Sequence, residues 1–225
     1  MIRIPIARKH ILDAKGWLAI EFFLLYIGFP AAFNTILHTY SPVPFLLAFG
    51  LAAAVCLIYN PDFPNRSFFN VKAVKAQFPR ILLIFVPAGF ILLAIVRFKY
   101  PHYLFYCPKN HITVWLSILW SYPLLAVYPQ EIIYRGFLFH RYRCLFGNSR
   151  YLMHASAWVF SFGHIIYYHP FSLLATLVGG YLFAYTYWKS RSLLAASMEH
   201  ALYGCFLYTI GLGRFFYTGI EKLLG

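Results

Sequence analysis

Acidic residues are scarce in this chain: its 225 residues include six aspartates and glutamates against 19 lysines and arginines. Only 11% of the residues are charged while 61% are hydrophobic, and this composition excludes an ordinary soluble domain. Long polar stretches that could form a separate soluble domain are also lacking. Apolar runs near the length needed to cross ~30 Å of hydrocarbon recur along the whole sequence. We therefore predict one integral membrane domain over residues 1–225.

Cysteines are few and widely separated, and no two of them have C-x-x-C spacing. The wide separation of the cysteines is not typical of a thiolate metal site, and it gives no sign of a disulfide framework. The four residues are Cys56, Cys107, Cys144 and Cys205.

The net charge of +13 could suggest a nucleic-acid partner, but the basic residues form short clusters between apolar runs. A membrane protein carries its topological charge in this way, so the lipid bilayer is the expected partner and nucleic acid is not. A basic group at 66–80 follows the second apolar run, and no lysine or arginine lies between the first and second runs. We predict a multi-pass protein of the cell inner membrane with a cytoplasmic N-terminus.

The apolar runs predict an all-α, polytopic membrane bundle with about seven to eight transmembrane helices. A further segment, 129–146, is too polar to face lipid and must pack against other helices or leave the membrane. It could also continue the helix before it, giving one long helix broken at Pro123 and Pro129. The predicted spans are 17–33, 43–59, 81–96, 112–128, 151–167, 171–188 and 193–212.

Two of the acidic residues, Glu131 and Glu199, fall within or beside apolar helices. A carboxylate in that environment is costly and points to a functional site once its partner is named. Glu131 has Arg135 four residues later on the same helical face. A structural ion pair that fixes this helix in the bundle and a functional carboxylate are both consistent with the spacing.

Histidines occur in two of the later apolar runs. Phe160 and His164 are four residues apart and share a helical face, and His200 follows Glu199 directly. Gly204 lies on the face of His200, where it leaves room either for packing or for a substrate. A single histidine inside a membrane is commonly structural, but several ionisable residues converge here, which favours a functional site.

These residues resemble the three motifs of the CPBP group of membrane proteins, which includes CAAX prenyl proteases of the Ras-converting endopeptidase type and bacteriocin-processing and immunity proteins. Glu131-x-x-x-Arg135, Phe160-x-x-x-His164 and His200 follow the order and spacing of that pattern. The resemblance covers about residues 112–212, a CPBP-like protease core. It implies an intramembrane endopeptidase that hydrolyses a hydrophobic or membrane-tethered peptide or protein by activated-water attack. Its polar cavity would open toward the cytoplasm.

Carried over from the family pattern, His164 would activate water and His200 would donate a hydrogen bond to the oxyanion. Two positions depart from the pattern: Gln130 replaces its first glutamate, and Gly204 replaces its final asparagine or aspartate. A glutamine amide does not take up a proton near neutral pH, so Gln130 cannot be the general base.

Either neighbouring carboxylate could supply the missing base. Pairing with Arg135 would make Glu131 a weaker base, whereas the sequence offers Glu199 no obvious cationic partner. We therefore expect Glu199 to be the substitute base and Glu131 to anchor Arg135. The cavity or substrate-binding candidates are Gln130, Phe160 and Gly204. The catalytic candidates are Glu131, Arg135, His164, Glu199 and His200.

Three alternatives stay open. A non-catalytic CPBP relative would act as a membrane binding or immunity protein, and it would keep the bundle without the base. A transporter or proton relay would also place Glu and His inside the membrane, but over several spans, whereas here they cluster in the second half. The sequence identifies no certain cofactor, and a divalent metal such as zinc stays open, because His164 and His200 with a carboxylate would suit it.

Overall fold

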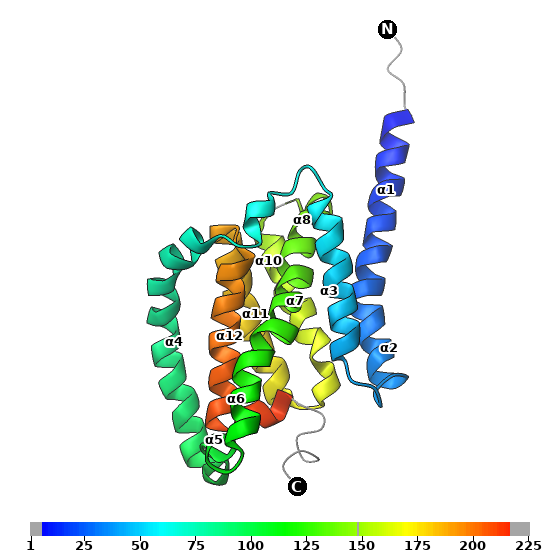
Figure 1. Ribbon diagram of the computed structural model, residues 1–225. Coiled ribbons are helices and arrows are strands. Elements are labelled where there is room, and N and C mark those ends of the chain that lie inside the picture. Colours follow the sequence, from blue (N-terminus) through cyan, green and yellow to red (C-terminus); the bar gives the residue numbers. More distant parts are fainter. Residues whose placement is uncertain (1–5, 148, 217–225) are drawn as a thin grey trace.

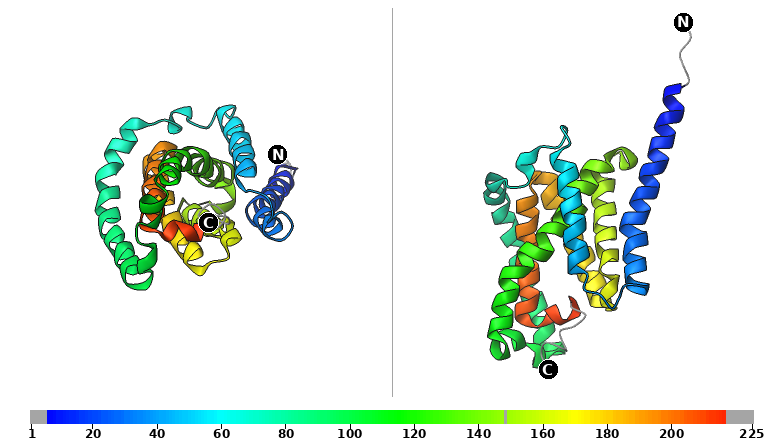
Figure 2. Two further views of the ribbon diagram at one scale, coloured as in Figure 1. Left: turned by 60° about the horizontal axis from the view of Figure 1, so that its bottom comes forward. Right: turned by 45° about the vertical axis from the view of Figure 1, so that its right-hand side comes forward.

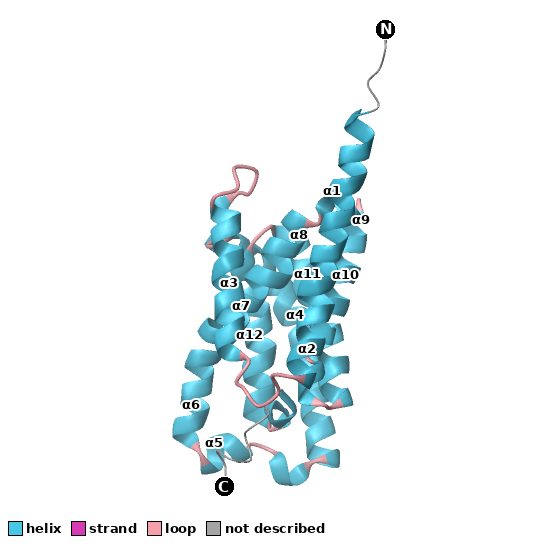
Figure 3. Ribbon diagram, turned by 90° about the vertical axis from the view of Figure 1, so that its right-hand side faces the viewer, coloured by secondary structure: helices cyan, strands magenta, loops and turns pink. Residues whose placement is uncertain are grey.

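The computed structural model describes residues 6–147 and 149–216, so the first five residues of the basic opening segment lie outside it. Within these ranges every regular element is a helix, which confirms the predicted all-α bundle. The helices run alongside one another, and the beginning of α1 (Ile6–Phe23) projects beyond the others (Figure 1 and Figure 3).

Helices at the two flanks of the bundle come from the first half of the chain. Helix α1 continues through a π-helical turn, η1 (Leu24–Gly28), into α2 (Phe29–Thr35), and α3 (Val43–Ile58) returns beside it. Helix α4 (Val71–Lys99) begins at Asn70, whose side-chain oxygen accepts the Ala73 N–H at 3.1 Å as an N-cap. Figure 2 shows α4 on one side of the bundle and α1 with α2 on the other.

The middle of the chain forms one unbroken helical run from Ile112 to Arg141. The sequence left open a single long helix over 112–146; the observed helix ends at Arg141 instead, and the expected breaks at Pro123 and Pro129 are wrong. Wider π-helical turns alternate with α-helix through this region, and each proline lies in the first turn of a segment. The segments are α6 (Ile112–Ser121), η4 (Tyr122–Val127), α7 (Tyr128–Glu131), η5 (Ile132–Phe137) and α8 (Leu138–Arg141), and the separate α9 (Arg143–Phe146) follows.

The centre of the bundle contains α10 (Ser149–Gly163), α11 (Pro170–Ser190) and α12 (Leu193–Ile210). Helices α10 and α11 pack closely because Gly180 has no side chain: a Cβ there would lie 3.0 Å from the Ala157 Cα. The short elements are η2 (Asn65–Ser67), η3 (Pro101–Tyr103), α5 (Tyr106–Asn110), η6 (Ile165–Tyr167) and η7 (Leu212–Phe216).

Large apolar side chains cover the outside of the bundle. Leu83 and Phe90 on α4 are 76% and 69% exposed, and Trp120 on α6 is 75% exposed. Such a surface suits lipid rather than water. Three described helical runs, 14–35, 71–99 and 112–141, are long and apolar enough to cross a membrane, and α3 is a shorter apolar helix. The count of seven to eight spans stays a prediction.

Candidate active site

Glu131 lies at the centre of a buried polar cluster. Its Oε2 is 3.2 Å from Nε of Arg135, the ion pair that the four-residue spacing predicted, although these two atoms are not aligned as a hydrogen bond. Its Oε1 is 2.8 Å from Nδ1 of His200, which α12 contributes. Glu131 and Arg135 are fully buried, and His200 is 5% exposed. Sequence motifs one and three therefore meet in space at this carboxylate.

Aromatic rings and one backbone carbonyl hold the Arg135 guanidinium. Its Cζ lies 4.3 Å from the ring centre of Phe160 and 5.6 Å from that of Phe183, and such cation–π contacts stabilise a buried cation. Arg135 Nη2 donates to the Gly180 carbonyl at 3.2 Å. Gly180 thus takes part both in the close contact of α10 with α11 and, through its carbonyl, in holding Arg135.

Both ring nitrogens of His200 have partners. A carboxylate can only accept, so Nδ1 carries the hydrogen that is donated to Glu131. In the neutral ring Nε2 then accepts a hydrogen bond from the Tyr122 hydroxyl at 3.1 Å. The neutral ring consequently has no N–H left for the oxyanion role that the family pattern implies for His200.

His164 follows the end of α10 and is held differently. Its Nδ1 lies 2.7 Å from the Phe160 carbonyl oxygen, which can only accept, so the hydrogen is on Nδ1 and Nε2 of the neutral ring is a proton acceptor. The Phe160 ring lies between the two histidines, with ring centres 4.6 Å from His164 and 5.4 Å from His200. The Phe160–His164 pair predicted from spacing is thus in contact.

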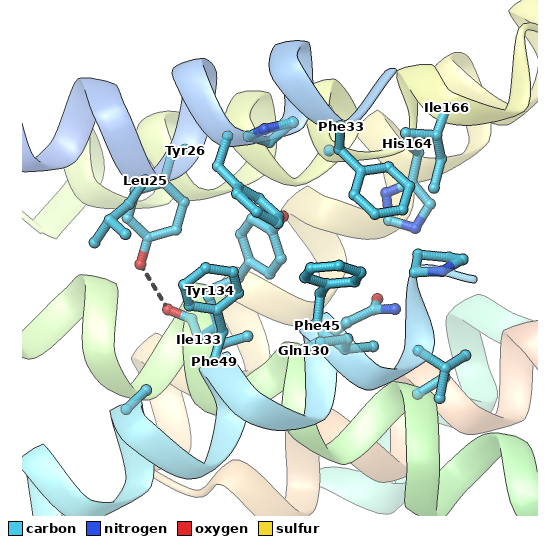
Figure 4. A pocket seen from close by; sticks show the side chains of 18 of the residues that line it. Leu25, Tyr26, Phe33, Phe45, Phe49, Gln130, Ile133, Tyr134, His164 and Ile166 are labelled. Carbon is cyan, nitrogen blue, oxygen red and sulfur yellow. Dashed lines mark hydrogen bonds between the residues drawn. The ribbon is translucent and has the colours of Figure 1, made fainter. Parts of the chain in front are cut away.

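His164 lines an apolar cavity of about 410 Å³ between α1–α2, α3 and the long helix. It lies at one end of this cavity with Phe33 and Ile166, and Gln130 lines the same region (Figure 4). Most of the lining is aliphatic or aromatic, and among the described residues no carboxylate contributes to it. The cavity can hold a hydrophobic chain beside an imidazole and an amide.

π-helical geometry around this cavity is stabilised from neighbouring helices. The Tyr26 hydroxyl donates to the Ile133 carbonyl at 2.8 Å, as Figure 4 shows, and Ser156 Oγ donates to the Tyr134 carbonyl at 2.8 Å. Both carbonyls belong to η5, which directly follows Glu131 and lines part of the cavity. Such π-helical turns are frequent at functional sites.

The two departures from the family pattern differ in their surroundings. Gln130 lines the cavity with His164, and its Oε1 is buried without a hydrogen-bond partner among the described residues. Gly204 does not line the cavity; a Cβ at this position would overlap the ring and hydroxyl of Tyr122. Tyr122 thus occupies the space that a longer side chain at 204 would need.

The expectation that Glu199 has no cationic partner is wrong. Arg80, from α4, lies 3.1 Å from Glu199 Oε1, and both Arg80 and Glu199 hydrogen-bond to the hydroxyl of Thr186. Arg80 was expected among the cytoplasmic basic residues, but it is nine residues inside α4. Glu199 is fully buried on this side of α12 and is not part of the cavity lining, which argues against its use as the base.

The available donors do not fit a zinc site. Among residues 6–147 and 149–216 no three His, Cys, Asp or Glu side chains form a group that could hold a metal. His200 uses both nitrogens within the protein, and His164 has only Nε2 left.

Tyr122, Arg80 and Thr186 are the residues that sequence reasoning missed. Tyr122 is one of 19 tyrosines and lies in an apolar run, so nothing in its local sequence marks it. Arg80 could have been found from the sequence, because it directly borders an apolar run. An arginine at the edge of a membrane span is costly unless it has a partner.

Fold and site together define an integral membrane protein of helical-bundle type, with an apolar cavity beside a buried Glu–His–Arg cluster. Residues 111–206 match the family model described as type II CAAX prenyl endopeptidase Rce1-like. This match confirms the CPBP resemblance over residues 111–206, which are similar to the Rce1-like family. At the family level it supports a CAAX-type intramembrane protease with a membrane-associated peptide or protein substrate. Neither the curated proteins nor the solved structures give a match.

Proposed function

We propose that this chain is an intramembrane endopeptidase that hydrolyses a hydrophobic or membrane-tethered peptide or protein. The observation that carries the proposal is the state of His164: its Nδ1–H is held by the Phe160 carbonyl, so Nε2 is the proton acceptor of a ring that borders the cavity. A positioned imidazole of this kind is the commonest general base.

In the proposed reaction, His164 Nε2 takes a proton from water as the water oxygen bonds to the substrate carbonyl carbon. The carbonyl becomes an oxyanion, and the imidazolium then gives its proton to the amide nitrogen as the C–N bond breaks. Gln130 can orient the water through its amide but cannot remove its proton. His164 therefore acts as the only base of the cavity among its described lining residues.

The proposed orientation has the N-terminus in the cytoplasm of a cell whose inner membrane holds the bundle. The start of α1, the α3–α4 connection and the end of α8 lie at one end of the bundle (Figure 1). Arg66 and Arg191 belong to the connections at this end, and Arg143 begins α9, which lies at the same end (Figure 3). In the described part of the chain the opposite end has fewer basic residues, among them Arg97 and Lys99 at the end of α4 and Lys109 in α5. An excess of basic residues on one side favours that side as the cytoplasmic one.

A second candidate is a non-catalytic relative that binds a hydrophobic peptide in the same cavity. Gln130 favours it, because a glutamine beside His164 removes the carboxylate that the family pattern uses for water activation. Binding then persists without hydrolysis.

The test is comparative peptidomics of membranes from cells expressing wild type, His164→Ala or His154→Ala at matched, folded levels. His154 is the matched control, because it lies on α10, the helix that ends just before His164, and it is exposed and bonds to Tyr181 outside the cavity lining. Peptide termini that vanish with His164→Ala alone support proteolysis. Gln130→Glu restores a carboxylate beside His164 and is expected to raise the abundance of those termini. Identical profiles from all folded variants would instead support the binding protein.

A further inference from the structure

Tyr122 and Gly204 are matched to one another. Tyr122 is the first residue of the π-helical segment η4, and Gly204 lies on the facing side of α12. A Cβ at position 204 would overlap Cε1, Cζ and Oη of Tyr122. The tyrosine can reach His200 only because residue 204 has no side chain.

The Tyr122 hydroxyl completes a row of hydrogen bonds. Glu131 Oε1 accepts from His200 Nδ1 at 2.8 Å, and His200 Nε2 lies 3.1 Å from the Tyr122 Oη. Because the carboxylate fixes the hydrogen on Nδ1, the neutral imidazole must accept the Tyr122 hydrogen at Nε2. This row fixes both the tautomer and the rotation of the ring.

Aromatic contacts restrict the same two side chains. The His200 ring is stacked on Phe183, with centres 4.5 Å apart and an interplanar angle of 14°. The Tyr122 ring meets His200 edge-on at 6.1 Å and packs against Tyr208 at 5.4 Å. These contacts therefore hold the Tyr122 hydroxyl within hydrogen-bonding distance of Nε2.

We propose that Tyr122 is a positioning residue of this site, which holds His200 as the Nδ1–H tautomer with Nε2 as acceptor and takes the place of a side chain at position 204. The catalytic consequence rests on the proposed function. His200 packs against the Phe160 ring, and the Phe160 carbonyl holds the Nδ1–H of the base His164. Tyr122 thereby positions the base through His200 and Phe160.

The experiment compares wild type, Tyr122→Phe and Tyr203→Phe as full chains in detergent micelles. Tyr203 is the matched control: it lies on α12, and its buried hydroxyl has no hydrogen-bond partner in the described part of the chain. One readout is the ¹⁵N spectrum of protein with labelled histidines. The His200 resonances are identified as those that disappear in His200→Gln. The other is the kinetics of cleavage of a fluorogenic peptide built on a terminus that depends on His164.

Tyr122→Phe is expected to shift the His200 Nε2 resonance. It is also expected to lower kcat roughly 10²-fold with KM unchanged, because the Phe160 ring contacts both His200 and the base His164, and a small displacement of the base has an effect of this size. Tyr203→Phe is expected to change neither. An unchanged Nε2 resonance in folded Tyr122→Phe would overturn the assignment, and so would wild-type kcat. If the wild type cleaves nothing, the proposed function fails together with the catalytic consequence. The spectrum alone then decides whether Tyr122 positions His200.

Discussion

At the scale of single residues, Glu131 balances the charge of a fully buried guanidinium. It is also the acceptor for His200, so one carboxylate joins two groups from different helices. Glu131→Gln removes the negative charge and leaves Arg135 uncompensated. We expect a loss of roughly 3–5 kcal/mol in the free energy of unfolding, the range for a broken buried pair. Chemical denaturation in mixed micelles measures it.

Glu21 supplies the matched control for this prediction. It forms a two-pronged pair with Arg141, at 2.7 and 3.0 Å, but the side chains are 33% and 48% exposed. Glu21→Gln is expected to cost about 1 kcal/mol or less, because water screens an exposed pair. Equal losses from the two substitutions would show that Glu131 has no special structural role.

The sequence predicted the contacts that lie within one helix and missed those between helices. Glu131 and Arg135 are one turn apart, so helical geometry alone brings them together. The bond from Glu131 to His200 joins positions 69 apart in the chain, and the bond from Arg80 to Glu199 joins positions 119 apart. Only the packing of the bundle decides such pairs. The family pattern named His200 but could not name Tyr122, because none of its three motifs covers that position.

At the scale of elements, Arg80 ties α4 to the central helices. Helix α4 lies at the edge of the bundle (Figure 1), and its Arg80 meets Glu199 of α12 and Thr186 of α11. We expect Glu199→Gln to destabilise the protein by roughly 1–3 kcal/mol, less than Glu131→Gln because the Arg80 side chain is 25% exposed. Hydrogen exchange in α4 should quicken, while peptide cleavage by the folded protein persists.

The double variant Arg80→Gln with Glu199→Gln separates charge from packing. Removing both charges leaves no unpaired ion, so the double variant should be more stable than Glu199→Gln alone. Complete loss of cleavage in folded Glu199→Gln would contradict this structural role and return Glu199 to the position of general base.

The long helix shows where prediction of elements reaches its limit. Its apolar start and polar end have different compositions, and Pro123 and Pro129 suggest breaks. The structure instead absorbs both prolines in a run that alternates α- and π-helix. Side chains from elsewhere, such as Tyr26 and Ser156, bind carbonyls of the π-helical turn η5. Local propensity contains no information about such distant partners.

At the scale of the whole molecule, the cavity lies where the N-terminal flank meets the segment that matches the family model. Helices α2 and α3 approach through aromatic side chains: the ring centres of Phe29 and Phe49 are 4.7 Å apart, and those of Phe33 and Phe45 are 5.5 Å apart. The part of the chain outside the family match therefore contributes a wall of the cavity. A bound hydrophobic chain should contact both parts.

Native cysteines make this arrangement measurable. Cys56 on α3 is exposed and lines the cavity, whereas Cys144 on α9 is exposed but lies outside the lining. We expect a decanoylated peptide to slow alkylation of Cys56 by an uncharged maleimide about fourfold, because an occupant at roughly 75% saturation leaves about a quarter of the cavities open. Alkylation of Cys144 should keep its rate, and peptide-level mass spectrometry separates the two sites. Equal slowing at both cysteines would indicate a general effect of the added lipid chain, and no slowing at Cys56 under saturating peptide would show that the chain binds elsewhere.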